Sequence, residues 1–270
     1  MKIIGIYNQK GGSGKTAISI NLSAFLAKKG ARVLDIDCDI QSNLTNALLF
    51  ECPEFTSVEN PICLVDLLND LENIDFTSAI YPAIIKRNSW TKGKKVGIDV
   101  LPSSINYETK LYTDPYLMKR LLDKINSLNI YDYVIIDFPP ERPYVNVSEK
   151  AYNLVTLALA SLNTLLIPCS PDMDSFTGYN ILLEHIRSIK GQYNPYLNSI
   201  SIVLNAVSNS SSDKNFLNFC NEYAGSSYSG IAIPYSGIYK QSRIANRPLA
   251  WFYSNSDVAI AYKKLAEFVK

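Results

Sequence analysis

A glycine-rich run followed by Lys-Thr lies near the start of the chain and is suited to binding phosphate. The run is Asn8-Gln9-Lys10-Gly11-Gly12-Ser13-Gly14-Lys15-Thr16. Glycines let backbone N–H groups surround a phosphate chain, and the N-terminus of a following helix adds partial positive charge. In such a loop the Lys15 ammonium reaches the β- and γ-phosphates, and the Thr16 hydroxyl binds Mg²⁺.

The segments on either side of this loop supply the context that a phosphate-binding loop needs. Residues 2–7 are apolar and predict a strand, and residues 16–29 predict a helix that stops at Gly30. The strict phosphate-loop pattern has a glycine where Gln9 stands, and a second lysine, Lys10, opens the loop. A flexible Gly-Ser turn is the simpler interpretation of the glycines, but it leaves the Lys-Thr pair and the flanking elements unexplained.

Carboxylates follow two further apolar segments. Asp37 and Asp39 come at the end of an expected strand at 32–37, and Asp137 ends an expected buried strand at 133–137. Ligands gather at the carboxyl ends of parallel strands. Hydrolysis of a γ-phosphate needs a positioned water and a shell for Mg²⁺, which such carboxylates can provide. A helix-capping aspartate and a plain buried strand remain the structural alternatives.

These three segments resemble the motifs of the ParA/MinD family of P-loop ATPases. Residues 10–16 resemble the family's deviant Walker A motif. Residues 37–43 resemble its D-x-D-P-Q-x-N pattern, with Ile40 in place of proline, and residues 132–140 resemble D-Y-x-x-x-D-x-P-P. Glu141-Arg142-Pro143 departs from the small residue that is common next. The resemblance covers most of the chain, from Lys2 to about Leu249.

The resemblance implies an ATP- and Mg²⁺-dependent hydrolase that dimerises around its nucleotide. It implies that Asp39 orients the attacking water and that Lys10 crosses the dimer interface to the partner's nucleotide, although a solvated surface lysine is the alternative. The implied catalytic residues are Lys10, Lys15 and Asp39, and the implied metal-supporting residues are Thr16, Asp37 and Asp137. The implied nucleotide contacts are Lys10, Gly11, Gly12, Ser13, Gly14, Lys15, Thr16, Ala17, Asn205 and Pro234, the last two at the adenine.

Two basic segments are candidates for binding nucleic acid. The resemblance suggests that Lys240, Arg243 and Arg247 contribute to a DNA-binding patch that dimerisation completes, whereas an ordinary solvated helix face is the alternative. Phosphate contacts of this kind would be independent of sequence and sensitive to salt. Residues 86–95 carry five cations and Trp90, which could bind a nucleic acid backbone, but a hydrated hairpin or loop is the simpler interpretation.

The function that the resemblance favours is DNA partition. ATP would drive formation of a homodimer that binds non-specific DNA, and a centromere-binding, ParB-like partner would stimulate slow hydrolysis. A MinD-type ATPase on a membrane or nucleoid surface is the alternative, and it needs an appended basic amphipathic helix. An ATP-dependent synthetase or amidase would need a second-substrate pocket, and an iron–sulfur reductase-like ATPase would need paired cysteines, for which Cys63 and Cys169 are poorly placed.

Composition limits the remaining classes. The 270 residues are 47% hydrophobic, with 26 basic against 25 acidic side chains, which argues against a globally basic nucleic acid binder. No run of 18 apolar residues is present, so we expect no membrane span and no stable membrane association. We expect no secretory signal, and five cysteines without C-x-x-C spacing predict reduced thiols in the cytoplasm, with nucleoid association in the ATP-bound state.

Strands alternating with helices predict one α/β domain over 1–270, with no N-terminal helix-turn-helix extension. We expect a P-loop NTPase fold: a mostly parallel twisted sheet flanked by helices on both faces. Further strands are expected at 97–101, 164–167, 199–204 and 230–233, and helices at 45–75 with interruptions, 115–128, 175–190 and 213–223. The last helix should bury a face formed by Val258, Ala261, Tyr262, Leu265, Phe268 and Val269. Asp35, inside a strand, needs a polar partner, and His185 is expected to be exposed.

Overall fold

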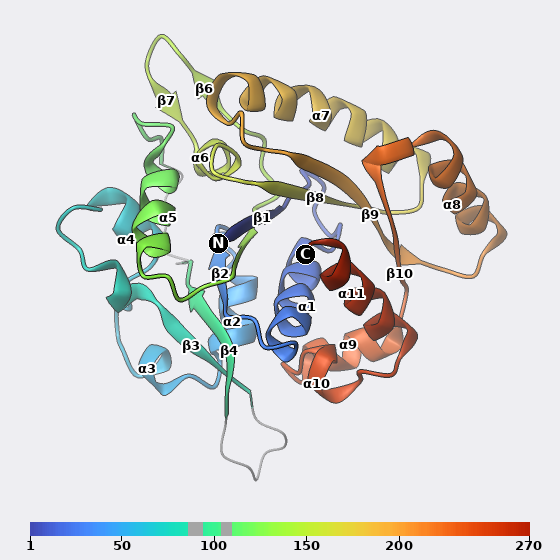
Figure 1. Cartoon of the computed structure of the whole chain (residues 1–270), viewed down its shortest axis with the longest axis horizontal. Helices are drawn as coiled ribbons and strands as arrows, with labels where there is room; N and C mark the ends of the chain where they lie inside the picture. Colours follow the sequence, from blue (N-terminus) through green and yellow to red (C-terminus); the bar gives the residue numbers. More distant parts are fainter. Residues whose placement is uncertain (86–93, 104–109) are drawn as a thin grey trace.

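The structure is a computed structural model that describes residues 1–85, 94–103 and 110–270, and it is built on an eight-stranded sheet (Figure 1). The strand order is β10-β9-β8-β1-β5-β2-β4-β3. The strands are β1 (Lys2–Ile6), β2 (Val33–Asp37), β3 (Tyr81–Ile85), β4 (Lys94–Leu101), β5 (Tyr133–Asp137), β8 (Thr164–Cys169), β9 (Ser199–Val207) and β10 (Tyr228–Pro234). A separate two-stranded sheet pairs β6 (Val145–Asn146) with β7 (Ala151–Tyr152).

The sheet is parallel except at one edge, where β3 runs antiparallel to β4. The expected mostly parallel α/β sheet is therefore confirmed, and the expected strands are all present. Strand β3 was not predicted from the sequence, nor were the two short strands β6 and β7. The parallel register aligns the carboxyl ends of the central strands, since Ile6 of β1 pairs with Asp137 of β5, and Asp137 pairs with Asp37 of β2.

Helices cover both faces of the sheet (Figure 1). One face packs against α1 (Lys15–Lys28), α2 (Asn43–Leu49), α10 (Leu249–Phe252) and α11 (Asp257–Phe268). The other face packs against α4 (Leu64–Asn69), α5 (Leu117–Ser127), α6 (Leu154–Leu159), α7 (Met173–Tyr193) and α8 (Ser211–Tyr223). Short helices α3 (Pro53–Thr56) and α9 (Gly237–Ile244), and 3-10 turns at Phe76–Ala79 and Gly225–Ser227, complete the described elements.

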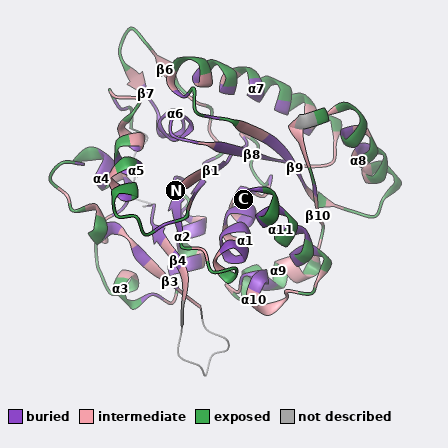
Figure 2. Ribbon diagram, in the orientation of Figure 1, coloured by how far each residue is buried: buried purple, intermediate pink, exposed green. Residues whose placement is uncertain are grey.

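The buried residues form two hydrophobic clusters, one on each side of the sheet (Figure 2). Alternation along the strands produces this division, because successive side chains point to opposite faces. In β5, for example, Val134 and Ile136 belong to the cluster that includes α5 and α6, whereas Ile135 belongs to the cluster that includes α1. A run that is apolar at every position is therefore what a strand covered on both faces requires.

The last helix, α11, buries most of the face predicted from its spacing. Val258, Ala261, Tyr262, Leu265 and Val269 are buried, as expected, and Ala259 and Ala266 join them. The prediction was wrong for Phe268, which is 42% exposed because it lies on the flank of the buried stripe, whereas Val269, one residue further along, returns to its centre.

Three further observations bear on the sequence expectations. The described part of the chain contains no helix that is long and apolar enough to cross a membrane. All five cysteines are free and buried. The basic stretch at 86–95 lies outside the described residues, apart from the backbone of Lys94 and Lys95 at the start of β4.

Candidate nucleotide-binding site

The glycine-rich loop connects β1 to α1 at the carboxyl edge of the sheet. Gly12 and Gly14 have positive φ angles of 73° and 98°, a left-handed backbone that glycine adopts without strain. A Cβ on Gly14 would also lie only 2.0 Å from Asn205 Nδ2. That amide donates a 2.9 Å hydrogen bond to the Ser13 carbonyl, so Asn205, at the end of β9, holds the loop in place.

Lys15 lies in this loop with little access to solvent. Its side chain is 7% exposed, and Nζ donates a 3.3 Å hydrogen bond to the Lys10 carbonyl, so the chain curls back over the loop. Burial lowers the pKa of Lys15, and the nearby carboxylates of Asp137 and Asp39 oppose this effect. A buried ammonium held by one carbonyl favours an anionic partner such as a phosphate.

Thr16 and Asp137 meet beside Lys15. The Thr16 hydroxyl donates a 2.7 Å hydrogen bond to Asp137 Oδ2, and Ser19 Oγ donates a 2.9 Å bond to Asp137 Oδ1. Asp137 is fully buried at the end of β5, where burial and then the charge of Asp37 raise its pKa. Two neighbouring buried carboxylates, Asp137 and Asp37, are costly when both are ionised. A cation bound beside Asp137 and the Thr16 hydroxyl would offset this electrostatic cost.

Asp37 and Asp39 follow β2 and have different surroundings. Asp37 is fully buried, and its oxygens accept hydrogen bonds from the Asp39 amide at 3.1 Å and from the amide and hydroxyl of Thr45 at 2.9 and 2.8 Å. Asp37 therefore anchors the start of α2 to the sheet, and its support of a metal stays a prediction. Asp39 Oδ1 accepts from the Gln41 amide at 2.9 Å, which fixes the carboxylate in the turn.

A cavity of about 450 Å³ opens beside these groups. Asp39 lines it together with the loop residues Gly11, Gly12, Gly14, Lys15, Thr16 and Ala17. Its far wall comes from Asn205, Ala206 and the segment after β10, including Pro234. The structure thus brings most of the predicted phosphate residues and the two predicted adenine residues together around one space, although the two groups are far apart in the sequence. Two predicted nucleotide contacts, Lys10 and Ser13, are not among the residues that line it.

A search for related proteins identifies the family. Residues 1–199 match the family model described as an AAA domain. The sporulation initiation inhibitor protein Soj of Bacillus subtilis is 33% identical over 201 residues, which cover 72% of this chain and 68% of Soj. The chain belongs to the ParA/MinD family of P-loop ATPases.

Solved structures share the fold of this ParA/MinD-family protein. Apo McdA from Cyanothece superposes with a TM-score of 0.75 at 21% identity, and each chain is covered completely. A plasmid partition protein from Borrelia burgdorferi, solved with AMPPNP, superposes with a TM-score of 0.71 at 22% identity over 99% of this chain and 96% of the other. The expected single-domain P-loop NTPase fold is therefore confirmed.

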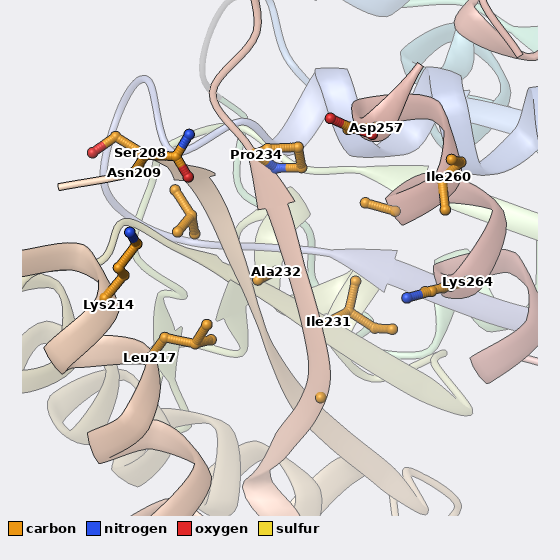
Figure 3. A pocket seen from close by; sticks show the side chains of 13 residues that line it. Ser208, Asn209, Lys214, Leu217, Ile231, Ala232, Pro234, Asp257, Ile260 and Lys264 are labelled. Atoms are coloured by element: carbon orange, nitrogen blue, oxygen red, sulfur yellow. The ribbon is translucent and has the colours of Figure 1, made fainter. Parts of the chain in front are cut away.

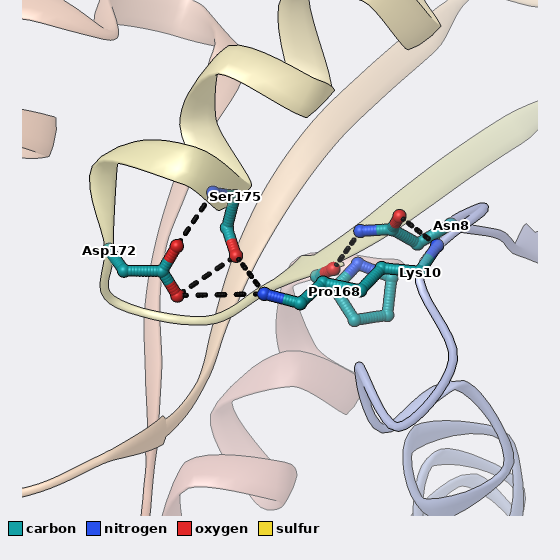
Figure 4. Close-up of polar contacts among 5 residues, drawn as sticks. All are labelled: Asn8, Lys10, Pro168, Asp172 and Ser175. Atoms are coloured by element: carbon teal, nitrogen blue, oxygen red, sulfur yellow. Dashed lines mark hydrogen bonds and ion pairs between the residues drawn. The ribbon is translucent and has the colours of Figure 1, made fainter.

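In this family member Lys10 contacts its own chain (Figure 4). Its Nζ donates a 3.1 Å hydrogen bond to Ser175 Oγ and lies 3.9 Å from Asp172 Oδ2, at the start of α7. The Asn8 side chain fixes the entrance of the loop. Its Nδ2 donates a 2.6 Å hydrogen bond to the Pro168 carbonyl, and its Oδ1 accepts a 2.9 Å hydrogen bond from the Lys10 backbone N–H. Lys10 is about half exposed, and its contact with a partner's nucleotide stays a prediction.

The predicted DNA-binding residues divide between two places. Lys240 and Arg243 line the same cavity of about 450 Å³, which we call the nucleotide cavity after the function proposed below. Arg243 also lies 3.4 Å from Asn43 Oδ1 at the start of α2. Arg247 is not among the residues that line this cavity, and its guanidinium lies 5.2 Å from the centre of the Phe252 ring. The sequence places Lys240, Arg243 and Arg247 on one segment after the last strand. Only the three-dimensional structure shows which of them line the cavity.

The sequence analysis missed three tyrosines of the cavity wall, Tyr235, Tyr239 and Tyr262. No spacing distinguished them from the core, and Tyr262 was taken as a core residue of the last helix, which it also is. Their aromatic rings give the far wall an apolar surface suited to a nucleobase. The prediction for His185 was wrong: its side chain is only partly exposed, and Nδ1 lies 3.5 Å from the Gln9 side-chain nitrogen at the entrance of the loop.

Asp35 has the polar partner that its position in a strand requires. Ser23 of α1 donates a short hydrogen bond to Asp35 Oδ1, whereas the buried Oδ2 has no partner within the described residues. Burial raises the pKa of Asp35 well above its usual range, and the charges of Asp137 and Asp37 add to this effect. Asp35 does not line the nucleotide cavity and has no assigned chemical role.

Proposed function

We propose that this protein is a Mg²⁺-dependent ATPase of the ParA type, which ATP converts into a homodimer that binds DNA without sequence preference. The observation that carries this proposal is the hydrogen bond from Thr16 to the buried Asp137, beside the buried Lys15. Thr16 and Lys15 also line the cavity of about 450 Å³. In P-loop ATPases a lysine, a hydroxyl and a strand-end carboxylate hold the phosphates and the metal.

The oxygen groups of the site suit Mg²⁺. Thr16 and Asp137 would hold the ion, and Mg²⁺ prefers such hard oxygen ligands and takes others from substrate phosphates. Among residues 1–85, 94–103 and 110–270, no group of three or more His, Cys, Asp or Glu side chains could form a metal site by itself. The remaining ligands of the ion would come from water and the nucleotide phosphates. When bound, the ion neutralises charge that develops on the phosphate oxygens.

Asp39 is the group that we assign to the attacking water. It is 8% exposed, lines the cavity, and has one oxygen fixed by the Gln41 amide at 2.9 Å. A carboxylate that is held on one oxygen can accept a hydrogen bond from water on the other. Asn205 and Pro234 form the wall that would face adenine, as expected from the family. The Borrelia neighbour, solved with an ATP analogue, supports this choice of nucleotide.

Dimerisation would move Lys10 from its contacts with Ser175 and Asp172 to the partner's nucleotide. An added cation on the γ-phosphate is a common requirement of phosphoryl transfer. The same dimer would bring together two copies of the basic segment with Arg247, which would contact DNA phosphates. A ParB-like, centromere-binding partner would then stimulate hydrolysis and release the dimer from DNA, which would segregate a plasmid or chromosome within the cytoplasm.

Two measurements test this function. Calorimetry with ATP and Mg²⁺ should show one nucleotide bound per chain, and Lys15→Ala should abolish the binding. Filter binding of random duplex DNA should then show retention that requires ATP and decreases steeply with salt. Absence of nucleotide binding by folded protein would overturn the ATPase, whereas nucleotide binding with no ATP-dependent retention of DNA would overturn only the partition function.

A further inference from the structure

A second cavity, of about 500 Å³, lies along the outer edge of the main sheet. Its floor is strand β10, from Gly230 to Pro234, and its walls come from α8 and α11 (Figure 3). These helices belong to opposite faces of the sheet, since α8 packs in one hydrophobic cluster and α11 in the other. The cavity is therefore a groove that follows the strand between two helices. We call it the β10 groove.

The floor of the groove is a strand with one unoccupied side. Within the described residues, β10 is the last strand of the sheet and pairs only with β9. Its other side presents backbone N–H and C=O groups that a further strand can pair with. Three features limit this pairing: Pro234 has no N–H, Gly230 has a positive φ of 73°, and the Ile231 N–H already donates a 3.2 Å hydrogen bond to Ser229 Oγ. An added strand would therefore be short and would pair with β10 mainly around Ala232.

The walls of the groove are basic and apolar. Lys214 projects from α8 on one side of β10, and Lys264 projects from α11 on the other. Neither lysine forms an ion pair within the described residues, and Asp257 is the one carboxylate that lines the groove. The apolar lining includes Leu217, Ile231, and Ile260, which is 42% exposed.

We propose that the β10 groove binds an extended acidic segment of a partner protein, which adds to β10 as a short ninth strand. Successive side chains of such a segment point alternately toward the two helices. Carboxylates on both faces could then reach Lys214 and Lys264, while apolar side chains cover Ile231 and Ile260. Backbone pairing supplies affinity and the side-chain contacts supply specificity, as in other cases of strand addition.

The shape of the groove favours a peptide over a second copy of this chain. A second copy would present its own β10 between its own α8 and α11, and two strands that lie between flanking helices cannot approach to the roughly 4.8 Å spacing of paired strands. A single extended segment has no such walls. Lysines and a proline can also simply protect a sheet edge from pairing. If the lysines and the proline only protect the edge, no acidic peptide should bind. A binding measurement therefore distinguishes a protected edge from a peptide-binding groove.

The probe is a fluorescein-labelled peptide of sequence VEEVEEV, which places glutamates on both faces of a strand. We expect saturable binding by fluorescence anisotropy in the absence of nucleotide, and slower hydrogen exchange of the backbone amides of residues 230–233 when the peptide is bound. Lys214→Glu with Lys264→Glu should weaken binding at least tenfold. Lys263→Glu with Lys270→Glu makes the same change of charge outside the groove and should leave the affinity within twofold.

Backbone pairing is tested separately from charge. A VEEVEEV peptide with N-methyl groups at alternate residues keeps its carboxylates but cannot donate on one edge, so we expect at least tenfold weaker binding for one of the two methylation registers. The proposal is overturned if VEEVEEV does not bind, if the two double variants lose affinity equally, or if both N-methylated peptides bind like the parent. Because no nucleotide is present, the result is independent of the proposed ATPase activity.

Discussion

The Thr16 hydroxyl and the Asp137 carboxylate are joined by a 2.7 Å hydrogen bond, although the two residues lie 121 positions apart. The bond exists because β1 and β5 are parallel neighbours that end in register, with Ile6 opposite Asp137. Thr16 follows β1 through the glycine-rich loop, and Asp137 is the last residue of β5. The order of the strands therefore brings Thr16 and Asp137 together. Their contact is the basis of the prediction for Asp137→Asn.

Asp137→Asn should reduce Mg²⁺-dependent ATP hydrolysis by roughly 100-fold or more, because the amide removes the negative charge that would face the cation. Phosphate release measured at saturating ATP gives the effect, and thermal unfolding confirms that the variant is folded. Asp132→Asn is the matched control. Asp132 Oδ2 accepts a 2.8 Å hydrogen bond from the Arg32 backbone N–H at the opposite end of β5, so this variant should keep full hydrolysis. Normal Mg²⁺-dependent turnover by Asp137→Asn would contradict the metal assignment.

Asp39→Ala should separate nucleotide binding from hydrolysis. The carboxylate lines the cavity but is not part of the glycine-rich loop, so we expect ATP affinity within a few-fold of the parent protein. Turnover should fall by about 100-fold to 10,000-fold, which is the usual contribution of a general base. Single-turnover hydrolysis and calorimetry give the two quantities. Loss of ATP affinity together with turnover would instead assign Asp39 to binding.

Lys10→Ala should abolish the ATP-dependent dimer while each chain still binds ATP. In the single chain Lys10 contacts Ser175 and Asp172, which do not line the nucleotide cavity, so its removal leaves that cavity intact. Light scattering with ATP and Mg²⁺ measures the dimer. Lys29→Ala is the control, because Lys29 pairs with Glu267 at 3.0 Å, away from the site. A Lys10→Ala protein that still dimerises with ATP would refute the role across the interface.

Arg247→Ala should weaken binding to random duplex DNA without changing ATP affinity, since Arg247 does not line the nucleotide cavity. If its guanidinium neutralises a DNA phosphate, the slope of log affinity against log salt should become shallower by about one unit in the variant. Arg243→Ala should also alter ATP affinity, because Arg243 lines that cavity. Unchanged DNA binding in Arg247→Ala would remove this residue from the DNA-binding patch.

Replacing Asp35 and Ser23 together should not destabilise the protein. Asp35 is fully buried, Ser23 satisfies one of its oxygens, and the other has no partner within the described residues. Asp35→Val with Ser23→Ala removes both polar groups, so the free energy of unfolding should stay constant or rise by up to about 3 kcal/mol. Ser23→Ala alone should lower it by about 1–3 kcal/mol, because the carboxyl loses its donor. Urea denaturation distinguishes the two outcomes.

Local sequence features were sufficient to predict most of the elements. Apolar strands such as Tyr133–Asp137 are evident because a strand buried on both faces is apolar throughout. Strand β3 was missed because Pro82 interrupts its apolar run, and proline inside a run argues against a strand except at the edge of a sheet, which is where β3 lies. Phe268 was placed in the core because it lies within the apolar half of the helix, whereas only the tertiary packing decides how far burial extends to the flanks of that half.

The glycine-rich loop, the carboxylates near the ends of strands β2 and β5, and the parallel α/β class could all be predicted from the sequence. Each of them depends on a short stretch of neighbouring residues. The tertiary structure alone decided which distant groups meet. It placed Asn205 against the Ser13 carbonyl, gave Asp35 its Ser23 partner, and turned Lys240 and Arg243 toward the nucleotide cavity while Arg247 stayed outside its lining. It also created the β10 groove, since a sheet edge between two helices depends on strand order and packing, which no local pattern records.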